Sequence, residues 1–337
     1  MSAQVLLIGN GSGEIPAIQE GLTIRFNGQA SVNPHRTLTV YNGKLAQAYL
    51  SAAVTHGDIT RLALTDCHIN KSHSTPELQV NGKIQPIERQ FAVHSDGASI
   101  EERAMLNHLS AIAIKQEQLL GAWPSSGFAV LGCLMAVGVP LRVCRMNLLP
   151  SLKRESTLSP RMPLPAVFHN WLGERRLAIE WLIGNEFDNS PIDWPSFWLP
   201  APVLHHPAAH KQSKRPSALF DMLYELSDCS KARAYKLWQQ LAESAPQDWL
   251  ENNELEDIAE DPLTNSHLLI AAEKLFILPR GENETSLWWL YDNEVSRWVS
   301  RVHYNLAWLS QSLTLRRHGL ALDALLHSGT ASQEFRR

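Results

Sequence analysis

Short apolar runs alternate with polar turns at the start of the chain. The runs are QVLLIGN, LTIRFNG and RTLTVYNG, and each ends at a Gly-Asn or an Asn-Gly pair. Apolar runs of this length, bounded by turn residues, are typical of strands buried on both faces of a parallel sheet. We therefore expect three parallel strands in this part of the chain.

Helical spacing and further apolar runs follow these strands. KLAQAYLSAAVTHGD has helical spacing and ends at a Gly, as helices often do, and ITRLALTDC is strand-like. IEERAMLNHLSAIAIKQEQLLGAW predicts one long helix with its charges on one side. SSGFAVLGCLMAVGV predicts a buried helix, because it is apolar nearly all round, and PLRVCRMNLLP predicts the next strand.

The last element of this half is amphipathic. NWLGERRLAIEWLIGN has an apolar face with helical spacing, made of Trp171, Leu172, Leu177, Trp181 and Leu182. Strands that alternate with helices favour an α/β fold, with a parallel sheet covered on both faces. Ligands of such folds bind at the carboxyl ends of the strands.

The composition changes near residue 188. DNSPIDWPSFWLPAPVLHHPAAHKQSKRPS is rich in Pro and predicts a linker or an irregular wrap. Helical segments rich in Trp and Leu follow it. We therefore expect an α/β domain over residues 1–190, a linker over 191–214 and a helical region over 215–330.

Composition and charge narrow the class of protein. Hydrophobic residues make up 44% of the 337 residues, the net charge is −4 and the pI is about 6.4, which argues against a general nucleic-acid binder. The start of the chain lacks the basic segment of a signal peptide, and no apolar stretch approaches the about 18 residues of a membrane span. We therefore expect a cytoplasmic protein with no transmembrane segment.

The cysteines fit a reducing compartment. No CxxC pair occurs, so we expect buried free thiols rather than disulfides or a metal site. The four cysteines are Cys67, Cys133, Cys144 and Cys229.

Several common motifs are absent or incomplete. GNGSGE has Glu14 where a dinucleotide fingerprint needs its third glycine, and no P-loop is present, so we do not expect NAD binding. LHHPAAHK brings His205, His206 and His210 together, but no nearby carboxylate or cysteine completes a metal site. We interpret it as a surface loop and expect no metal.

Polar residues interrupt the apolar scaffold in three segments. Asn10 and Asn27 follow the first two predicted strands; they either cap turns or converge on a nucleotide. PSSGF places Ser125, Ser126 and Gly127 at a predicted helix start, where they either cap the helix or bind an anion.

The third segment is FHNWLGE. His169 lies at a helix start, with Glu174 inside the helix. The pKa of a histidine lies near neutrality, which suits a general base; a structural or surface role is the alternative.

Together these segments resemble the sialylmotifs of the eukaryotic-type sialyltransferases, glycosyltransferase family 29. That family's large motif opens with a strand and a Gly-Asn turn and ends in RFN or RMN; this chain has LLIGNGSG and then IRFNGQ. The small motif resembles PSSGFAVLGCLMAVGVPLRVCRMNLLPS, and the very short motif resembles HNWLGE. The order agrees, and the resemblance covers residues 1–190.

The resemblance implies a Rossmann-like, GT-A-variant domain that binds a CMP-sugar without a metal or other cofactor. The residues that contact the nucleotide would be Asn10, Asn27, Ser125, Ser126 and Gly127, with Gly9, Gly11 and Glu174 in support. His169 would deprotonate the acceptor hydroxyl. The implied activity is inverting transfer of sialic acid, Kdo or a related nonulosonic acid to a glycan acceptor.

Several alternatives stay open. The chain is such an enzyme, a non-catalytic nucleotide-binding or scaffolding protein with the same fold, or another α/β enzyme that uses a different nucleotide. We interpret the Trp-rich helices of 215–330 as a plain helical core; completion of the acceptor site, a peripheral membrane contact or a homo-oligomer contact are the alternatives for them.

Overall fold

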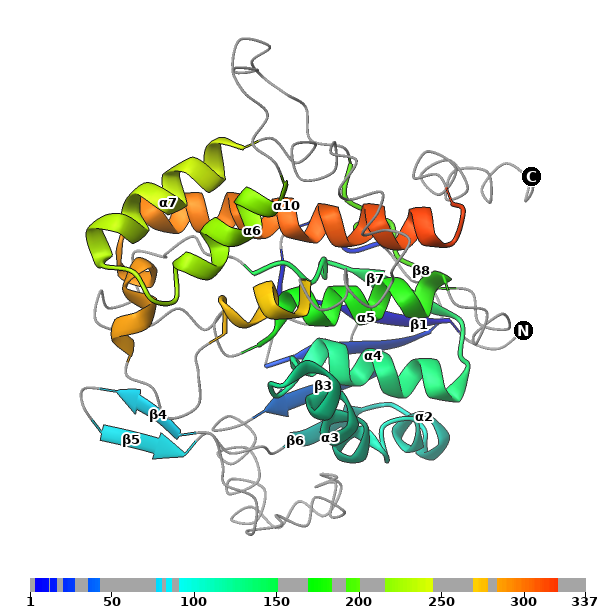
Figure 1. The fold of residues 1–337 in the computed structure, drawn as a ribbon. Helices are drawn as coiled ribbons and strands as arrows, with labels where there is room; N and C mark the ends of the chain where they lie inside the picture. The colour runs from blue at the N-terminus through cyan, green and yellow to red at the C-terminus, as the bar shows by residue number, and fades with distance from the viewer. Residues whose placement is uncertain are drawn as a thin grey trace. The chain divides into compact units, whose positions relative to one another are not determined.

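The computed structural model describes twelve segments of the chain, which form two compact units. One unit is Met1–Asn147 with Gly184–Phe197, and the other is Leu148–Ile183 with Trp198–Arg337 (Figure 1). The helix expected at KLAQAYLSAAVTHGD and the strand at ITRLALTDC lie outside the described residues. The described segments are 4–11, 13–16, 21–27, 36–42, 77–80, 83–86, 91–150, 169–183, 192–200, 216–244, 269–277 and 284–320.

A six-stranded sheet forms the centre of the first unit, with strand order β6-β3-β2-β1-β7-β8. All neighbouring strands run parallel except β6, which is antiparallel to β3. The α/β class is confirmed, and so are four of the predicted strands, which are β1, β2, β3 and β7. The strands are β1 (Val5–Ile8), β2 (Leu22–Phe26), β3 (Thr37–Asn42), β6 (Phe91–Asp96), β7 (Leu141–Cys144) and β8 (Ile192–Asp193).

The apolar runs explain why β1, β2 and β3 are central. All four residues of β1 are buried, and Leu7 is 0% exposed. A strand covered on both faces has no polar side, so its sequence reads as a continuous apolar run.

The antiparallel edge corrects the expectation of a purely parallel sheet. Only the first three residues of β6 are buried, and polar residues follow them. This pattern suits an edge strand, which needs apolar residues over only part of its length. A separate two-stranded sheet, β4 (Glu77–Val80) and β5 (Lys83–Pro86), was also not predicted.

The long helix expected over IEERAMLNHLSAIAIKQEQLLGAW is two helices, α2 (Ile100–Ala104) and α3 (Leu109–Leu120). Between them, the N–H of Leu106 donates to the carbonyl of Arg103, so the α-helical bonding pattern is interrupted. Such i to i−3 bonds tighten the chain into a turn. The helical pattern was therefore correct but its continuity was wrong.

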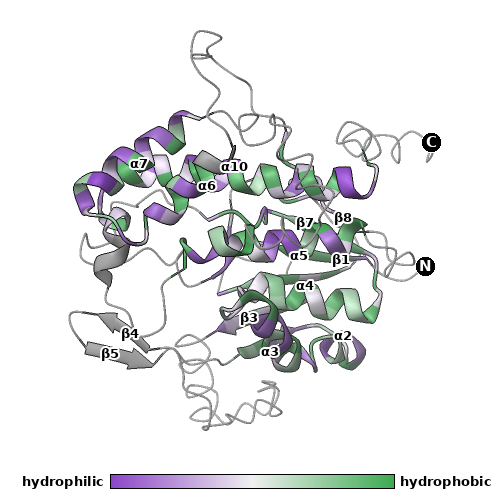
Figure 2. Cartoon of the chain, in the orientation of Figure 1, coloured by the Kyte–Doolittle hydropathy of each residue, from purple (hydrophilic) through white to green (hydrophobic). Residues whose placement is uncertain are grey.

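The buried helix predicted from SSGFAVLGCLMAVGV is α4 (Ser126–Val137), and it contacts β3 and α3. It begins at the N-cap Ser125 and ends at Gly138, which has the left-handed φ of 73° common at helix C-termini. Figure 2 shows its apolar character along most of its length. The strand expected after it, β7, carries the chain back into the sheet.

The second unit is helical, which confirms the helical C-terminal region for its described residues. Its core includes the buried side chains of Trp238, Trp289 and Trp308. α10 contacts α5, α7 and η5. The elements are α5 (Trp171–Ile183), α6 (Pro216–Glu225), α7 (Lys231–Glu243), the 3-10 helix η5 (Glu284–Tyr291) and α10 (Asn293–Arg317), with a helical turn at 269–274.

The buried face of α5 differs from the predicted one. Leu172 is buried as expected, but Leu177 and Trp181 are only half-buried. The fully covered positions include Glu174 and Arg175 instead. The sequence prediction used only the spacing of apolar residues. In the structure, hydrogen-bond partners within this unit allow charged residues of α5 to lie on its buried face.

The segment expected to be a linker contributes to the first unit. Ile192 and Asp193 form β8, which pairs with β7 at the sheet edge. The described cysteines, Cys133, Cys144 and Cys229, are free. Of the helices in the described segments, none has the length and apolarity needed to cross a membrane.

Candidate functional site

The candidate site lies at the carboxyl ends of the parallel strands in the first unit. The strand order changes direction at β1, since β2 and β3 lie on one side of it and β7 and β8 on the other. Parallel α/β sheets bind ligands at such a topological switch point. The residues that follow β1 and β7 therefore form the candidate site.

Gly9 and Gly11 hold the chain against the end of β7. The N–H of Gly9 donates to the carbonyl of Cys144 at 2.9 Å, and that of Gly11 donates to Arg145 at 2.8 Å. A Cβ on Gly9 would lie 2.3 Å from the carbonyl oxygen of Arg145, so the close approach requires glycine. Asn10, between them, is exposed at this edge.

Ser125 and Ser126 use their hydroxyls differently. The Ser125 hydroxyl caps α4 by accepting from the N–H of Phe128 at 3.3 Å. The Ser126 hydroxyl accepts from Nδ2 of Asn42, the last residue of β3, at 2.6 Å. Helix capping therefore explains Ser125, while Ser126 ties the helix start to the end of a strand.

Gly127 brings the start of α4 close to two strand ends. A Cβ there would lie 2.9 Å from Sδ of Met146 and 3.9 Å from Cε2 of Phe26. Met146 also lies 2.7 Å from the position of a Cβ on Gly9. The glycine-rich turn after β1 and the Ser-Ser-Gly turn therefore meet around Met146, although more than 100 residues separate them.

Asn27 has two unusual features. Its φ is 52°, in the left-handed region that asparagine tolerates better than most residues. Its Oδ1 is buried and has no hydrogen-bond partner among the described residues. The turn explains the backbone, but an unpaired buried acceptor is costly and needs a partner.

His169 and Glu174 belong to the second unit. His169 is half-buried, and its ring lies edge-on to Trp171, with 5.4 Å between the ring centroids. Glu174 is 0% exposed, and its N–H donates to the carbonyl of Asn170 at 2.8 Å. The carboxylate of Glu174 therefore lies inside the packed helices rather than at the surface.

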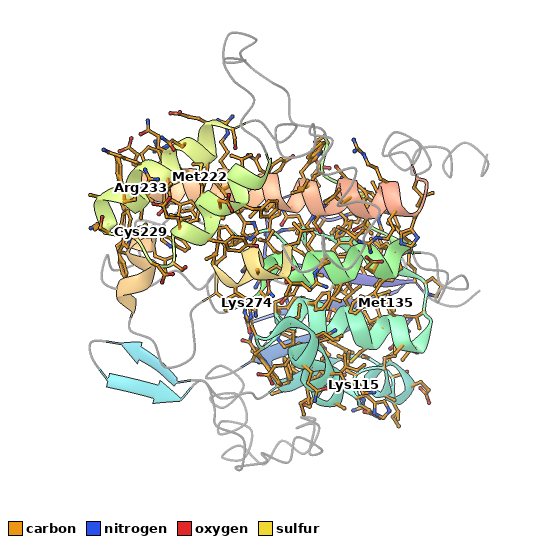
Figure 3. All side chains as sticks on the ribbon, in the orientation of Figure 1. Lys115, Met135, Met222, Cys229, Arg233 and Lys274 are labelled. Carbon is orange, nitrogen blue, oxygen red and sulfur yellow. The ribbon has the colours of Figure 1, made fainter. Side chains whose placement is uncertain are left out.

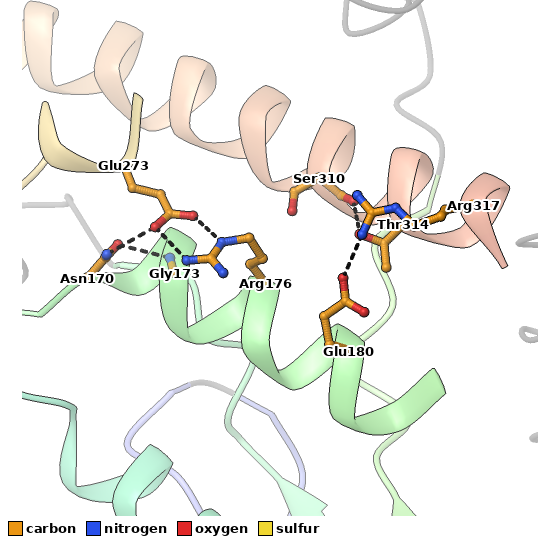
Figure 4. A network of polar contacts seen from close by, with 8 residues as sticks. All are labelled: Asn170, Gly173, Arg176, Glu180, Glu273, Ser310, Thr314 and Arg317. Atoms are coloured by element: carbon orange, nitrogen blue, oxygen red, sulfur yellow. Dashed lines mark hydrogen bonds and ion pairs between the residues drawn. The ribbon is translucent and has the colours of Figure 1, made fainter. Parts of the chain in front are cut away.

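Asn170, the residue after His169 in the chain, fixes the start of α5 through the contacts drawn in Figure 4. Its Oδ1 accepts from the N–H of Gly173 at 2.9 Å, and its Nδ2 donates to Oε2 of Glu273 at 3.2 Å. Glu273 also accepts from Nε of Arg176 at 2.6 Å. The residue that follows His169 in the chain is thus held by a buried network.

Two residues at the site were not predicted, Asn42 and Arg145. The signal for Asn42 was in the sequence, since Tyr41-Asn42-Gly43 repeats the aromatic-Asn-Gly pattern of Phe26-Asn27-Gly28. Arg145 had no signal, because its importance comes from its contact with Gly11.

The two described thiols of the first unit, those of Cys133 and Cys144, are not candidate nucleophiles. Burial raises the pKa of Cys133 to about 12. Burial also raises the pKa of Cys144, and the positive charges of Arg145 and Arg142 only partly oppose this. Both thiols are therefore protonated at neutral pH.

No group of three or more His, Cys, Asp or Glu side chains in the described segments is arranged to hold a metal ion. His205, His206 and His210 lie outside these segments. No family model, no curated protein and no solved structure matches this chain. The fold alone therefore defines the class: an α/β protein with a mostly parallel six-stranded sheet and a helical C-terminal region.

Proposed function

We propose that the first unit binds the cytidine monophosphate part of a CMP-activated acidic sugar and that the chain is an inverting glycosyltransferase. The observation that supports this most is the meeting of two separate sequence motifs. The turn after β1 and the Ser125–Gly127 turn adjoin at the carboxyl edge, around Met146. These are the segments whose resemblance to sialylmotifs implies contact with the nucleotide.

The chemistry of the edge suits a nucleotide. Asn27 and Asn42 present neutral amides, which can both donate to and accept from a base edge or a ribose hydroxyl. The unpaired Oδ1 of Asn27 needs a donor, and the N4 amino group of cytosine is one. The first turn of α4 presents the positive end of the helix dipole to a phosphate.

The proposed reaction is a direct displacement. The acceptor hydroxyl loses its proton to the imidazole of His169 while its oxygen bonds to the anomeric carbon. The bond from that carbon to the phosphate oxygen breaks, and CMP leaves with the bonding electrons. CMP is a good leaving group, so one base and stabilisation of the phosphate are enough for this step.

Calorimetric titration with CMP tests the proposal, with CDP, UMP, GDP and NAD as competitors. We expect selective CMP binding that is lost in Asn27→Gly, because glycine keeps the left-handed turn and removes only the amide. Ser126→Ala is the second test. CMP binding unaffected by both variants, or a preference for NAD or GDP, would contradict the proposed site.

A second measurement tests catalysis. His169→Ala should keep CMP binding and lose sugar transfer, whereas His108→Ala, which changes an exposed histidine of the first unit, should keep both. Normal turnover by His169→Ala would exclude it as the base. Wild-type protein that binds CMP and transfers no acidic sugar to any glycan would be the non-catalytic nucleotide-binding protein of the alternative.

A further inference from the structure

We propose that Arg145 binds the phosphate group of the ligand at this site. The ligand is then a nucleotide whose phosphate is bound by one arginine. This inference rests on the proposed function for the location of the nucleotide. It does not depend on which base the nucleotide carries.

Arg145 occupies an unfavourable backbone conformation at the switch point. It is the first residue after β7, and its φ is 54°. Arginine gains nothing from this region, which glycine and asparagine occupy at lower cost. Left-handed residues other than glycine concentrate at functional sites, where the surrounding structure holds them.

The turn after β1 is shaped around this arginine. Nε of Arg145 donates to the carbonyl of Gly11 at 2.6 Å. A Cβ on Gly9 or on Gly11 would come within 2.3 or 2.7 Å of the Arg145 carbonyl oxygen, and one on Gly13 would lie 3.7 Å from its Cγ. The glycines thus allow the loop to pack on Arg145 and to fix its side chain.

Among the described residues, the guanidinium of Arg145 has one hydrogen-bond acceptor, the carbonyl of Gly11, so its other donors lack a partner in these segments. Nε is used by Gly11, and the two terminal nitrogens carry four more N–H bonds. Arg142 pairs with Asp193 at 3.2 Å, whereas no carboxylate of the described segments forms an ion pair with Arg145. Two parallel N–H bonds from one arginine match two phosphate oxygens.

The start of α4 lies close by. Sδ of Met146, the residue after Arg145, lies 2.9 Å from the position that a Cβ on Gly127 would take, so the backbone at Arg145 and the start of α4 lie at the same edge of the sheet. A phosphate there would meet a guanidinium and the positive end of a helix dipole. Arg145 would give the phosphate a positively charged partner, whereas the hydroxyls of Ser125 and Ser126 are neutral.

The test compares CMP with cytidine, which differ only in the phosphate. We expect Arg145→Gln to weaken CMP binding by roughly 10- to 100-fold, as loss of a charged hydrogen bond does, and to leave cytidine binding unchanged. Arg145→Asn repeats the test with a residue that tolerates the left-handed conformation, in case the Gln variant folds poorly. Lys115→Gln on α3 (Figure 3) removes one exposed positive charge from the same unit and should change neither affinity.

Four outcomes separate this inference from the proposed function. The expected pattern supports both. CMP binding that is equal in wild type and both Arg145 variants overturns the role of Arg145 and leaves the proposed function standing. Arg145-dependent binding of UMP, AMP or GMP, without CMP binding, supports Arg145 and contradicts the CMP-sugar proposal. Absence of binding by all four monophosphates overturns both.

Discussion

Gly9→Ala is the sharpest test of how β1 and β7 are joined. The new Cβ would lie 2.3 Å from the carbonyl oxygen of Arg145 and 2.7 Å from Cβ of Met146, and real Cβ contacts stay beyond 3.0 Å. The nearest atom belongs to the backbone, so rotation of a side chain cannot relieve the clash. The strand ends must move apart, at the expense of two hydrogen bonds from Gly9 and Gly11.

The expected loss of stability follows from these contacts. Overpacking of a close contact costs about 1–3 kcal/mol, and each weakened backbone hydrogen bond adds about 1 kcal/mol. With two such bonds weakened, we therefore expect Gly9→Ala to lower the free energy of unfolding by about 3–5 kcal/mol. Urea unfolding measures this loss. Hydrogen–deuterium exchange of peptides covering β1 and β7 assigns it to the first unit.

Gly127→Ala is the matched control. Its Cβ would lie 2.9 Å from Sδ of Met146, the end of a flexible side chain that can turn away. Alanine also favours the helix over glycine by about 1 kcal/mol, which offsets the movement of Met146. A Gly9→Ala protein as stable as Gly127→Ala, with unchanged exchange in β1, would refute the explanation of the glycine-rich turn.

Two further predictions concern the second unit. Glu273→Ala should lower the free energy of unfolding of this unit by about 2–4 kcal/mol, because Arg176 and Asn170 lose the carboxylate that accepts their hydrogen bonds. Urea unfolding measures this loss, with Glu294→Ala, which removes an exposed carboxylate, as the control. An equal effect of the two variants would contradict the prediction. Burial, reinforced by Arg175, lowers the pKa of His303 to about 3 from 6.5. Between these pH values His303 is protonated in the unfolded state and neutral in the folded state. The free energy of unfolding should therefore fall as the pH drops from 6.5 towards 3, by up to about 1.4 kcal/mol per pH unit. His303→Gln should flatten this dependence, and an unchanged slope would show that other groups cause it.

The sheet could be predicted because strands that are buried on both faces appear in the sequence as short apolar runs. The run that became β1 is apolar throughout, those that became β2 and β3 are buried over most of their length, and β7 follows a helix that is apolar nearly all round. The antiparallel strand β6 left no comparable trace, since half of its residues are polar or only partly covered. Its pairing with β3 depends on partners that periodicity does not specify.

The candidate site was only partly predictable for a similar reason. Ser125 and Gly127 are residue types that indicate a helix start, and Asn27 is a residue type that indicates the turn after a strand. The bond between Asn42 and Ser126 joins residues that are 84 positions apart, and the one between Arg145 and Gly11 joins residues 134 apart. Only the folded sheet brings such residues together.

The glycines show how one pattern can have two explanations. A glycine-rich turn after a first strand usually lets a phosphate approach the backbone. Here the space beside Gly9 and Gly11 is already taken by the backbone of Arg145. The missing third glycine of the fingerprint, at Glu14, is then no defect, because this turn serves to hold an arginine rather than to surround a pyrophosphate.

The backbone and the side chain of Asn27 require different explanations. The turn after β2 accounts for its φ of 52°, since asparagine is among the residues that adopt this conformation most readily. Glycine would serve the turn equally well and would bury no polar atom. The turn does not account for the buried Oδ1, which lacks a partner among the described residues and costs about 1–3 kcal/mol while unpaired. The proposed nucleotide would supply a donor to this oxygen, because the strand end that Asn27 occupies is where ligands of such sheets bind.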